Sequence, residues 1–115
     1  MRYADEPYIA LHHLERIERL AARTRVSKVA RSPKGFLTAY KIAGGDPYAM
    51  GRDQYSGQLW EERRANFIKR HMSAARRGRE RLWKGGYPSR RHLSLMMWAY
   101  TPTPEKTMRW LRRVR

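Results

Sequence analysis

Two histidines and one arginine are the side chains whose types and spacing could support chemistry. Arg64 and His71 are seven residues apart in a stretch of helical periodicity, so both lie on the apolar face that Trp60 and Phe67 define. His92 stands near the start of a second apolar segment. Around a phosphodiester, the histidines could act as acid and base while the arginine stabilises the charge that develops. The sequence thus identifies Arg64, His71 and His92 as a possible phosphate pocket.

The same three side chains also suit a structural role. A polar residue within an apolar stripe is most often buried and hydrogen-bonded to Tyr, Trp or main-chain groups, and we favour that interpretation. The carboxylates are scattered, and C-x-x-C, H-E-x-x-H and nucleophile-elbow motifs are absent from the sequence. We therefore expect a binding protein rather than an enzyme, with no catalytic residues, metal site or cofactor. A small nuclease that uses His71 and His92 is an alternative.

The charge of the chain points to a class of partner. Lys and Arg total 26 against 10 Asp and Glu, so the formal net charge is +16. This exceeds what solubility needs, and self-repulsion would destabilise the compact state unless the charge is neutralised. Nucleic acid is the polyanion that such a composition favours, and DNA and RNA are not distinguished. An acidic protein surface in a larger assembly is the alternative partner.

The basic residues are densest between positions 63 and 91. Lys or Arg occupies positions 63, 64, 69, 70, 76, 77, 79, 81, 84, 90 and 91, and Glu80 is the single acid. Most of these positions fall away from the apolar stripe. The predicted contacts to phosphate are Arg63, Lys69, Arg70, Arg76, Arg77, Arg79, Lys84, Arg90 and Arg91.

Four helices are expected to position these residues. The stretch 88–100, P-S-R-R-H-L-S-L-M-M-W-A-Y, is apolar around most of a helical circumference, so the other elements must cover it. Amphipathic periodicity predicts helices over 6–23, with Asp5 as its cap, and over 56–77. Pro104–Arg115 is expected to form a last helix that packs through Met108, Leu111 and Val114 and opens first.

One β-hairpin is expected over about residues 26–42. R-V-S-K-V-A-R and F-L-T-A-Y-K-I are rich in β-branched and aromatic residues, and S-P-K-G between them suits a type I turn. Phe36, Thr38, Tyr40 and Ile42 would line one face of the second strand. The glycine-rich stretches 43–57 and 78–87 are interpreted as loops.

Together these elements predict one domain over residues 1–115. Its expected class is α+β, mostly α, with about four helices around the apolar helix 88–100 and one hairpin. The chain has no cysteine, which fits a reducing compartment, and its start does not resemble a signal peptide. No run approaches about 18 uncharged apolar residues, so we expect no membrane span. The expected location is the cytoplasm of a host cell, or a virion.

A family resemblance bears on the last expectation. W-E-E-R-R-A-N-F-I-K-R-H, followed by P-S-R-R-H-L-S-L-M-M-W-A-Y, resembles small uncharacterised domains encoded by tailed phages, over about residues 56–104. Those domains bring no assigned activity and no functional positions. The resemblance implies a phage or another mobile element as the source. Non-enzymatic binding to the phosphate backbone is the first choice of function, and a virion structural or assembly protein that docks on acidic partners or the packaged genome is the second.

Overall fold

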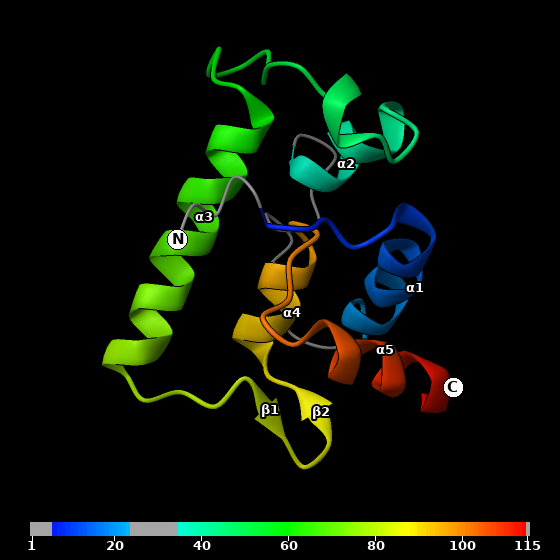
Figure 1. The fold of residues 1–115 in the computed structure, drawn as a ribbon, viewed down its shortest axis with the longest axis vertical. Coiled ribbons are helices and arrows are strands. Elements are labelled where there is room, and N and C mark those ends of the chain that lie inside the picture. The colour runs from blue at the N-terminus through cyan, green and yellow to red at the C-terminus, as the bar shows by residue number, and fades with distance from the viewer. Residues whose placement is uncertain (1–5, 24–34, 115) are drawn as a thin grey trace.

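The computed structural model describes residues 6–23 and 35–114 and confirms a mostly α, α+β architecture (Figure 1). Five α-helices and one two-stranded antiparallel sheet occur within these residues. In chain order the elements are α1 (Leu11–Ala21), α2 (Phe36–Ile42), the 3-10 helix η2 (Pro47–Ala49), α3 (Trp60–Arg77), β1 (Trp83–Lys84), β2 (Tyr87–Pro88), α4 (Arg90–Met96) and α5 (Pro104–Arg113).

The segment that contains α4 forms the centre of the core, as its apolar sequence predicts. Figure 1 shows α3 along one edge of the molecule, with α4 between α3 and α1. Trp98, just after α4, stacks on Phe36 of α2 and on Phe67 of α3, with ring centroids 5.3 and 4.5 Å apart. Every residue from Leu95 to Tyr100 is buried. The other helices therefore pack around this short segment.

The helix predicted over 88–100 is shorter in the structure, because a tight C-terminal turn ends it at Met96. The amide of Tyr100 donates to the Leu95 carbonyl at 3.2 Å, and that of Ala99 donates to the Met96 carbonyl at 2.8 Å. These two bonds form a Schellman motif, in which Ala99 takes the left-handed position at φ +57° that glycine usually occupies. The turn leaves the carbonyls of Trp98 and Ala99 outside the helical hydrogen bonds.

The second strand of the predicted hairpin is wrong, because residues 36–42 form the helix α2. Phe36, Leu37 and Tyr40 are buried, which is the i, i+1, i+4 pattern of a helical face, whereas Ile42 is 83% exposed. The first predicted strand lies outside the described residues. The hairpin of the structure is β1–β2, within and just after the stretch 78–87 interpreted as a loop, where Gly85 and Gly86 both have positive φ.

The first helix also begins later than predicted. Ala10 is the N-cap of α1, and residues 7–10 precede the helix. The amide of Ile9 donates to the Ala99 carbonyl at 2.8 Å, so the segment before α1 is bonded to the turn that follows α4. Asp5, the predicted cap, lies outside the described residues. The predicted helix 56–77 corresponds to α3, which begins at Trp60.

The C-terminal helix α5 closes the core from the side of α1. Its buried residues are Thr107, Trp110 and Leu111, while Met108 is only half-buried. The side chain of Arg16 donates to the Val114 carbonyl and so joins α1 to the end of α5. Within the described ranges, no helix is long and apolar enough to cross a membrane.

Candidate functional site

Arg64 lies on the side of α3 that faces the core and is 0% exposed. Its Nε donates to the Trp98 carbonyl at 2.8 Å, and its Nη2 donates to the carbonyls of Ala99 at 2.8 Å and Pro7 at 3.0 Å. The Nη1 atom donates to the Glu6 carbonyl at 3.1 Å. The guanidinium therefore joins the segment before α1 to the turn after α4.

The cationic Arg64 is held by dipoles and ring faces. Its Cζ lies 3.8 Å from the ring centroid of Tyr8 and 5.9 Å from that of Tyr100, within the range of cation–π attraction. Burial lowers the pKa of Arg64, although a guanidinium keeps its proton in proteins. The planar fork suits four acceptors at fixed angles, which a lysine ammonium could not satisfy.

His92 belongs to a separate buried network. It is 0% exposed, and its Nδ1 lies 3.0 Å from the Leu82 carbonyl, to which only a ring N–H can donate. Its Nε2 must then accept from the Thr101 hydroxyl at 2.8 Å, and that hydroxyl lies 2.8 Å from the hydroxyl of Thr107. Burial lowers the pKa of His92 to about 4, so the ring is neutral near pH 7.

His71 is half-buried on α3 and belongs to a third group. Its Nδ1 accepts a hydrogen bond from Arg91 Nη1 at 3.0 Å, because a guanidinium can only donate. Arg91 is also paired with Glu80, with Nε 2.6 Å from Oε2. Burial, followed by the charges of Arg91 and Arg70, lowers the pKa of His71. The neutral ring of His71 accepts this hydrogen bond and thus orients Arg91 in the first turn of α4.

The structure therefore does not bring Arg64, His71 and His92 together around one open pocket. Arg64 and His92 have no exposed surface, and their hydrogen bonds go to different segments of the chain. For these two residues the structure supports the buried, hydrogen-bonded role that we favoured from the sequence. In the described part of the chain, no three His, Asp or Glu side chains gather as metal ligands would.

The predicted phosphate contacts, by contrast, lie mostly on the surface. Lys69, Arg70, Arg76 and Arg77 are exposed on the side of α3 that faces away from the core. Arg79, Lys84 and Arg90 are exposed on the turn, the hairpin and the first turn of α4 that follow. In Figure 1 these elements run without interruption down one edge of the molecule and across its end. We call the surface that carries these seven cations the α3 face.

Two of the predicted contacts already have acidic partners. Arg63 forms an ion pair with Asp53 and lies over Trp60, with its Cζ 5.2 Å from the ring centroid. Asp53 also accepts from the amide of Tyr55 and the hydroxyl of Ser56, and these bonds lower its pKa. Arg91 is paired with Glu80. The charges of Arg63 and Arg91 are therefore largely balanced within the protein.

The middle of the α3 face is hollowed. An open depression of about 540 Å³ is lined by Lys69, Arg70 and Arg77 together with Asn66 and Ser73. Asn66 and Ser73 are neutral hydrogen-bonding residues that we did not include among the predicted contacts. Their signal in the sequence is the helical spacing of 66, 69, 70, 73 and 77, which places all five on one side of α3. Such a surface can hold an anion by charge and by neutral hydrogen bonds.

Comparison of the chain with protein-family models, curated proteins and solved structures finds no match. The functional conclusion therefore depends on the residues and geometry of this chain.

Proposed function

We propose that this protein binds nucleic acid through the phosphate backbone, without catalysis, by means of the α3 face. The observation that carries the proposal is the run of exposed cations along α3 and its continuation. Among the described residues, Lys69, Arg70, Arg77, Arg79, Lys84 and Arg90 make no ion pair. Their charge is available to an external anion.

The dimensions of the α3 face suit an extended polyanion. The 18 residues of α3 span about 27 Å, at about 1.5 Å per residue. Duplex DNA carries one charge per about 1.7 Å of its axis, so several phosphates come within reach of a surface of this length. Asn66 and Ser73 can add neutral hydrogen bonds between the cations, as amide and hydroxyl side chains do at phosphate and sugar oxygens. The arrangement favours backbone contacts over the reading of base edges.

The proposal is tested by the salt dependence of binding to duplexes of unrelated sequence. Each phosphate contact contributes roughly −0.9 to the slope of log affinity against log salt concentration. Five to seven contacts should give a slope of about −4 to −6, nearly equal for all sequences. The triple variant Lys69→Ala, Arg70→Ala, Arg77→Ala should bind more weakly and reduce the size of the slope by about 2.7.

A matched control removes the same charge from another helix. Arg109, Arg112 and Arg113 are exposed on α5, and changing all three to alanine also lowers the net charge by three. This variant should keep most of the affinity and slope, because its changes lie off the α3 face. Equal losses in the two triple variants would show that only total charge matters. No binding of any polynucleotide at low salt would overturn the proposal itself.

A further inference from the structure

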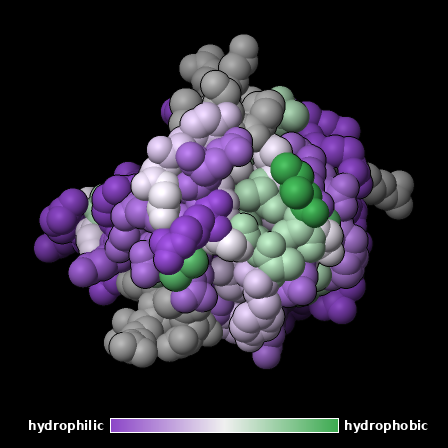
Figure 2. Space-filling model, turned by 90° about the horizontal axis from the view of Figure 1, so that it is seen from above, coloured by the Kyte–Doolittle hydropathy of each residue, from purple (hydrophilic) through white to green (hydrophobic). Residues whose placement is uncertain are grey.

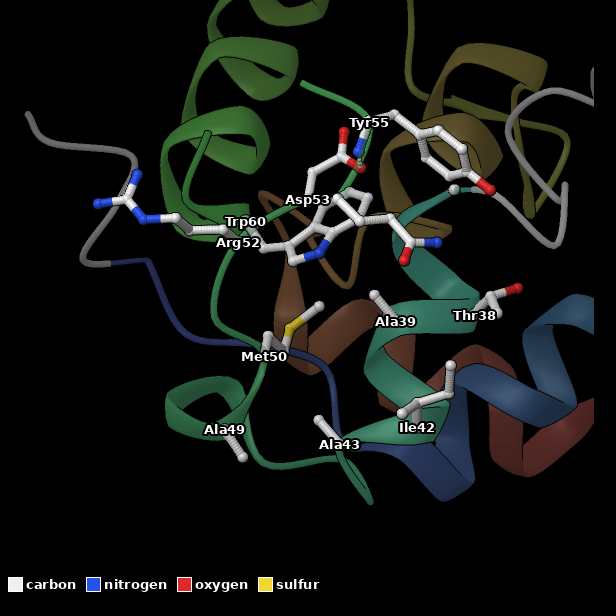
Figure 3. Close-up of a pocket in the computed structure, with 12 residues that line it drawn as sticks. Thr38, Ala39, Ile42, Ala43, Ala49, Met50, Arg52, Asp53, Tyr55 and Trp60 are labelled. Atoms are coloured by element: carbon white, nitrogen blue, oxygen red, sulfur yellow. Dashed lines mark hydrogen bonds between the residues drawn. The ribbon is translucent and has the colours of Figure 1, made fainter. Parts of the chain in front are cut away.

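An open hollow lined by both apolar and polar side chains lies at the end of the molecule where α2 meets the loop before α3. Its volume is about 420 Å³, and its lining includes Ala39 and Ala43 of α2, Met50 of the loop and Trp60 at the start of α3. Figure 3 shows Ala39, Met50 and Trp60 converging on this space, while the side chain of Arg52 extends away from it. Figure 2, which looks down on this end, shows a green patch bordered by hydrophilic surface.

A large apolar side chain stands beside the hollow. Ile42, the last residue of α2, lines its edge and is 83% exposed, and Tyr55 on the opposite loop is 64% exposed. The patch therefore carries both a projecting side chain and a recess. A surface that holds both can pair with its own copy, because a two-fold axis places each projection against the other copy's recess.

The charge of this end separates it from the rest of the chain. Residues 35–62 contain two cations, Lys41 and Arg52, and four acids, Asp46, Asp53, Glu61 and Glu62, a net charge of −2 in a chain of +16. All other residues together carry +18. Two copies would repel each other wherever their basic surfaces meet, and residues 35–62 are the least basic part of the chain that the structure describes. Exposed Arg52, Glu61 and Glu62 also allow cation to oppose anion across a two-fold axis.

We propose that the α2 hollow is the contact surface for a second copy of this chain in a symmetric dimer. Ile42 of each protomer would enter the hollow of its partner. A polyanion is a poor occupant, because the segment carries net negative charge. The α3 faces start at this end and run away from it, so the dimer would place two basic surfaces on opposite sides of the contact. The proposal does not depend on nucleic-acid binding.

The test is the oligomeric state of the full chain, freed of nucleic acid, by analytical ultracentrifugation. Measurements at about 0.15 M and about 1 M salt separate apolar association from charge effects. The wild-type protein should form a dimer and no larger species. Ile42→Lys should raise the dissociation constant by about 100-fold or more, equivalent to about 2.7 kcal/mol. Ile42→Ser, which adds no charge, should weaken the dimer in the same direction by about 10-fold.

The matched control is Tyr87→Lys. Tyr87 is a second exposed large side chain, 53% exposed, and it lies on β2, far from α2 in Figure 1. This variant adds the same charge as Ile42→Lys and should leave the dimer unchanged. Equal weakening by both lysine variants, a wild-type monomer at millimolar concentration, or growth into species larger than a dimer would each overturn the proposal. Ile42 is largely exposed, whereas the ring of Tyr87 also contacts Trp110, so circular dichroism must show that both lysine variants keep the wild-type fold.

Discussion

At the scale of single residues, the unusual feature is a buried arginine that makes no ion pair with a carboxylate of residues 6–23 or 35–114. The charge of Arg64 is met by four carbonyl dipoles and by the rings of Tyr8 and Tyr100. Those carbonyls come from two segments more than 90 positions apart. Removing the guanidinium would leave all four carbonyls without this donor. While it is present, its hydrogen bonds hold both segments in place.

Substitution of Arg64 should therefore be costly for stability. Arg64→Ala should lower the free energy of unfolding by about 2–4 kcal/mol, because buried acceptors lose their donor. Arg64→Lys should also destabilise, since three ammonium donors cannot serve four carbonyls placed for a planar fork. Urea denaturation measures both. Arg70→Ala, an exposed change on the same helix, should stay within about 0.5 kcal/mol of wild type. A lysine variant as stable as wild type would contradict the proposed role of the fork.

His92 predicts a loss of stability in mild acid. Its pKa is about 4 in the folded protein and about 6.5 when the chain is unfolded. Between these values the unfolded state binds a proton that the folded state does not, so unfolding becomes easier as the pH falls. The neutral His92 contributes its full share to the free energy of unfolding above pH 6.5. About 3 kcal/mol of that share is lost as the pH falls to about 4.

The variant His92→Gln isolates this effect, because glutamine does not titrate. Free energies of unfolding measured by urea denaturation from pH 7 to about pH 4 should fall more steeply for wild type than for the variant. His13 and His71, whose pKa values are also lowered, are present in both proteins and cancel in the difference. Parallel curves of unfolding free energy against pH for the two proteins would show that folding does not lower the pKa of His92, and would contradict the prediction.

At the scale of elements, α5 belongs to the core. The sequence predicted a marginal helix held by Met108, Leu111 and Val114, whereas Trp110 is 3% exposed and contacts the rings of Trp83 and Tyr87. Val114 is buried too, but it follows the last helical residue. The tryptophans of the sequence were interpreted as core residues, but Trp110 was not counted among the side chains that hold this helix in place.

Deletion of residues 105–115 should therefore prevent cooperative folding. The deletion removes Trp110 and Leu111, and truncating such side chains to alanine costs about 3–5 and 2–5 kcal/mol, respectively. That loss approaches the whole stability of a typical domain, about 5–15 kcal/mol. Circular dichroism and urea denaturation of the shortened chain are the measurement, with Arg112→Ala as an exposed control. A shortened chain that still unfolds cooperatively would restore the view of α5 as an accessory helix.

The elements show how far the sequence could predict the fold. Long periodic segments, such as α3, and the apolar run around α4 were predictable because burial follows helical spacing. Residues 36–42 were not, because Phe36 and Tyr40 fit both a strand and a helix, and packing on Trp98 decided the outcome. The end of α4 depends on a left-handed alanine, which no local preference indicates. At the site, the exposed cations could be predicted, whereas the acid partners of Arg63 and Arg91 required the tertiary fold.

At the scale of the whole molecule, charge is unevenly distributed. The segment 35–62 carries −2, and the remaining chain carries +18. The α3 face thus begins beside the least basic end and continues toward the hairpin. Repulsion among the cations acts on the folded protein when no anion is bound, and salt screens it over a distance of about 10 Å at about 0.1 M.

Salt should therefore affect the free protein and its complex in opposite directions. Raising sodium chloride from about 0.01 M to about 0.3 M should increase the Tm of the free protein by a few degrees, because about 1 kcal/mol corresponds to roughly 4 °C in a domain of this size. With saturating polynucleotide, the same change should lower the Tm, since salt dissociates the stabilising ligand. Differential scanning calorimetry measures both. A Tm of the free protein that falls with salt would contradict the self-repulsion.

The four carbonyls that accept hydrogen bonds from Arg64 also have a consequence for synthesis on the ribosome. Two of its four acceptors, in Glu6 and Pro7, are synthesised before Arg64 itself, and the other two, in Trp98 and Ala99, are synthesised after it. A nascent chain that stops short of residue 99 can form α1 and α3 but cannot surround the guanidinium, which must stay hydrated. The packing around Arg64 therefore cannot be completed step by step while the chain is being synthesised. Its final packing waits for the turn that follows α4 and then forms as one unit.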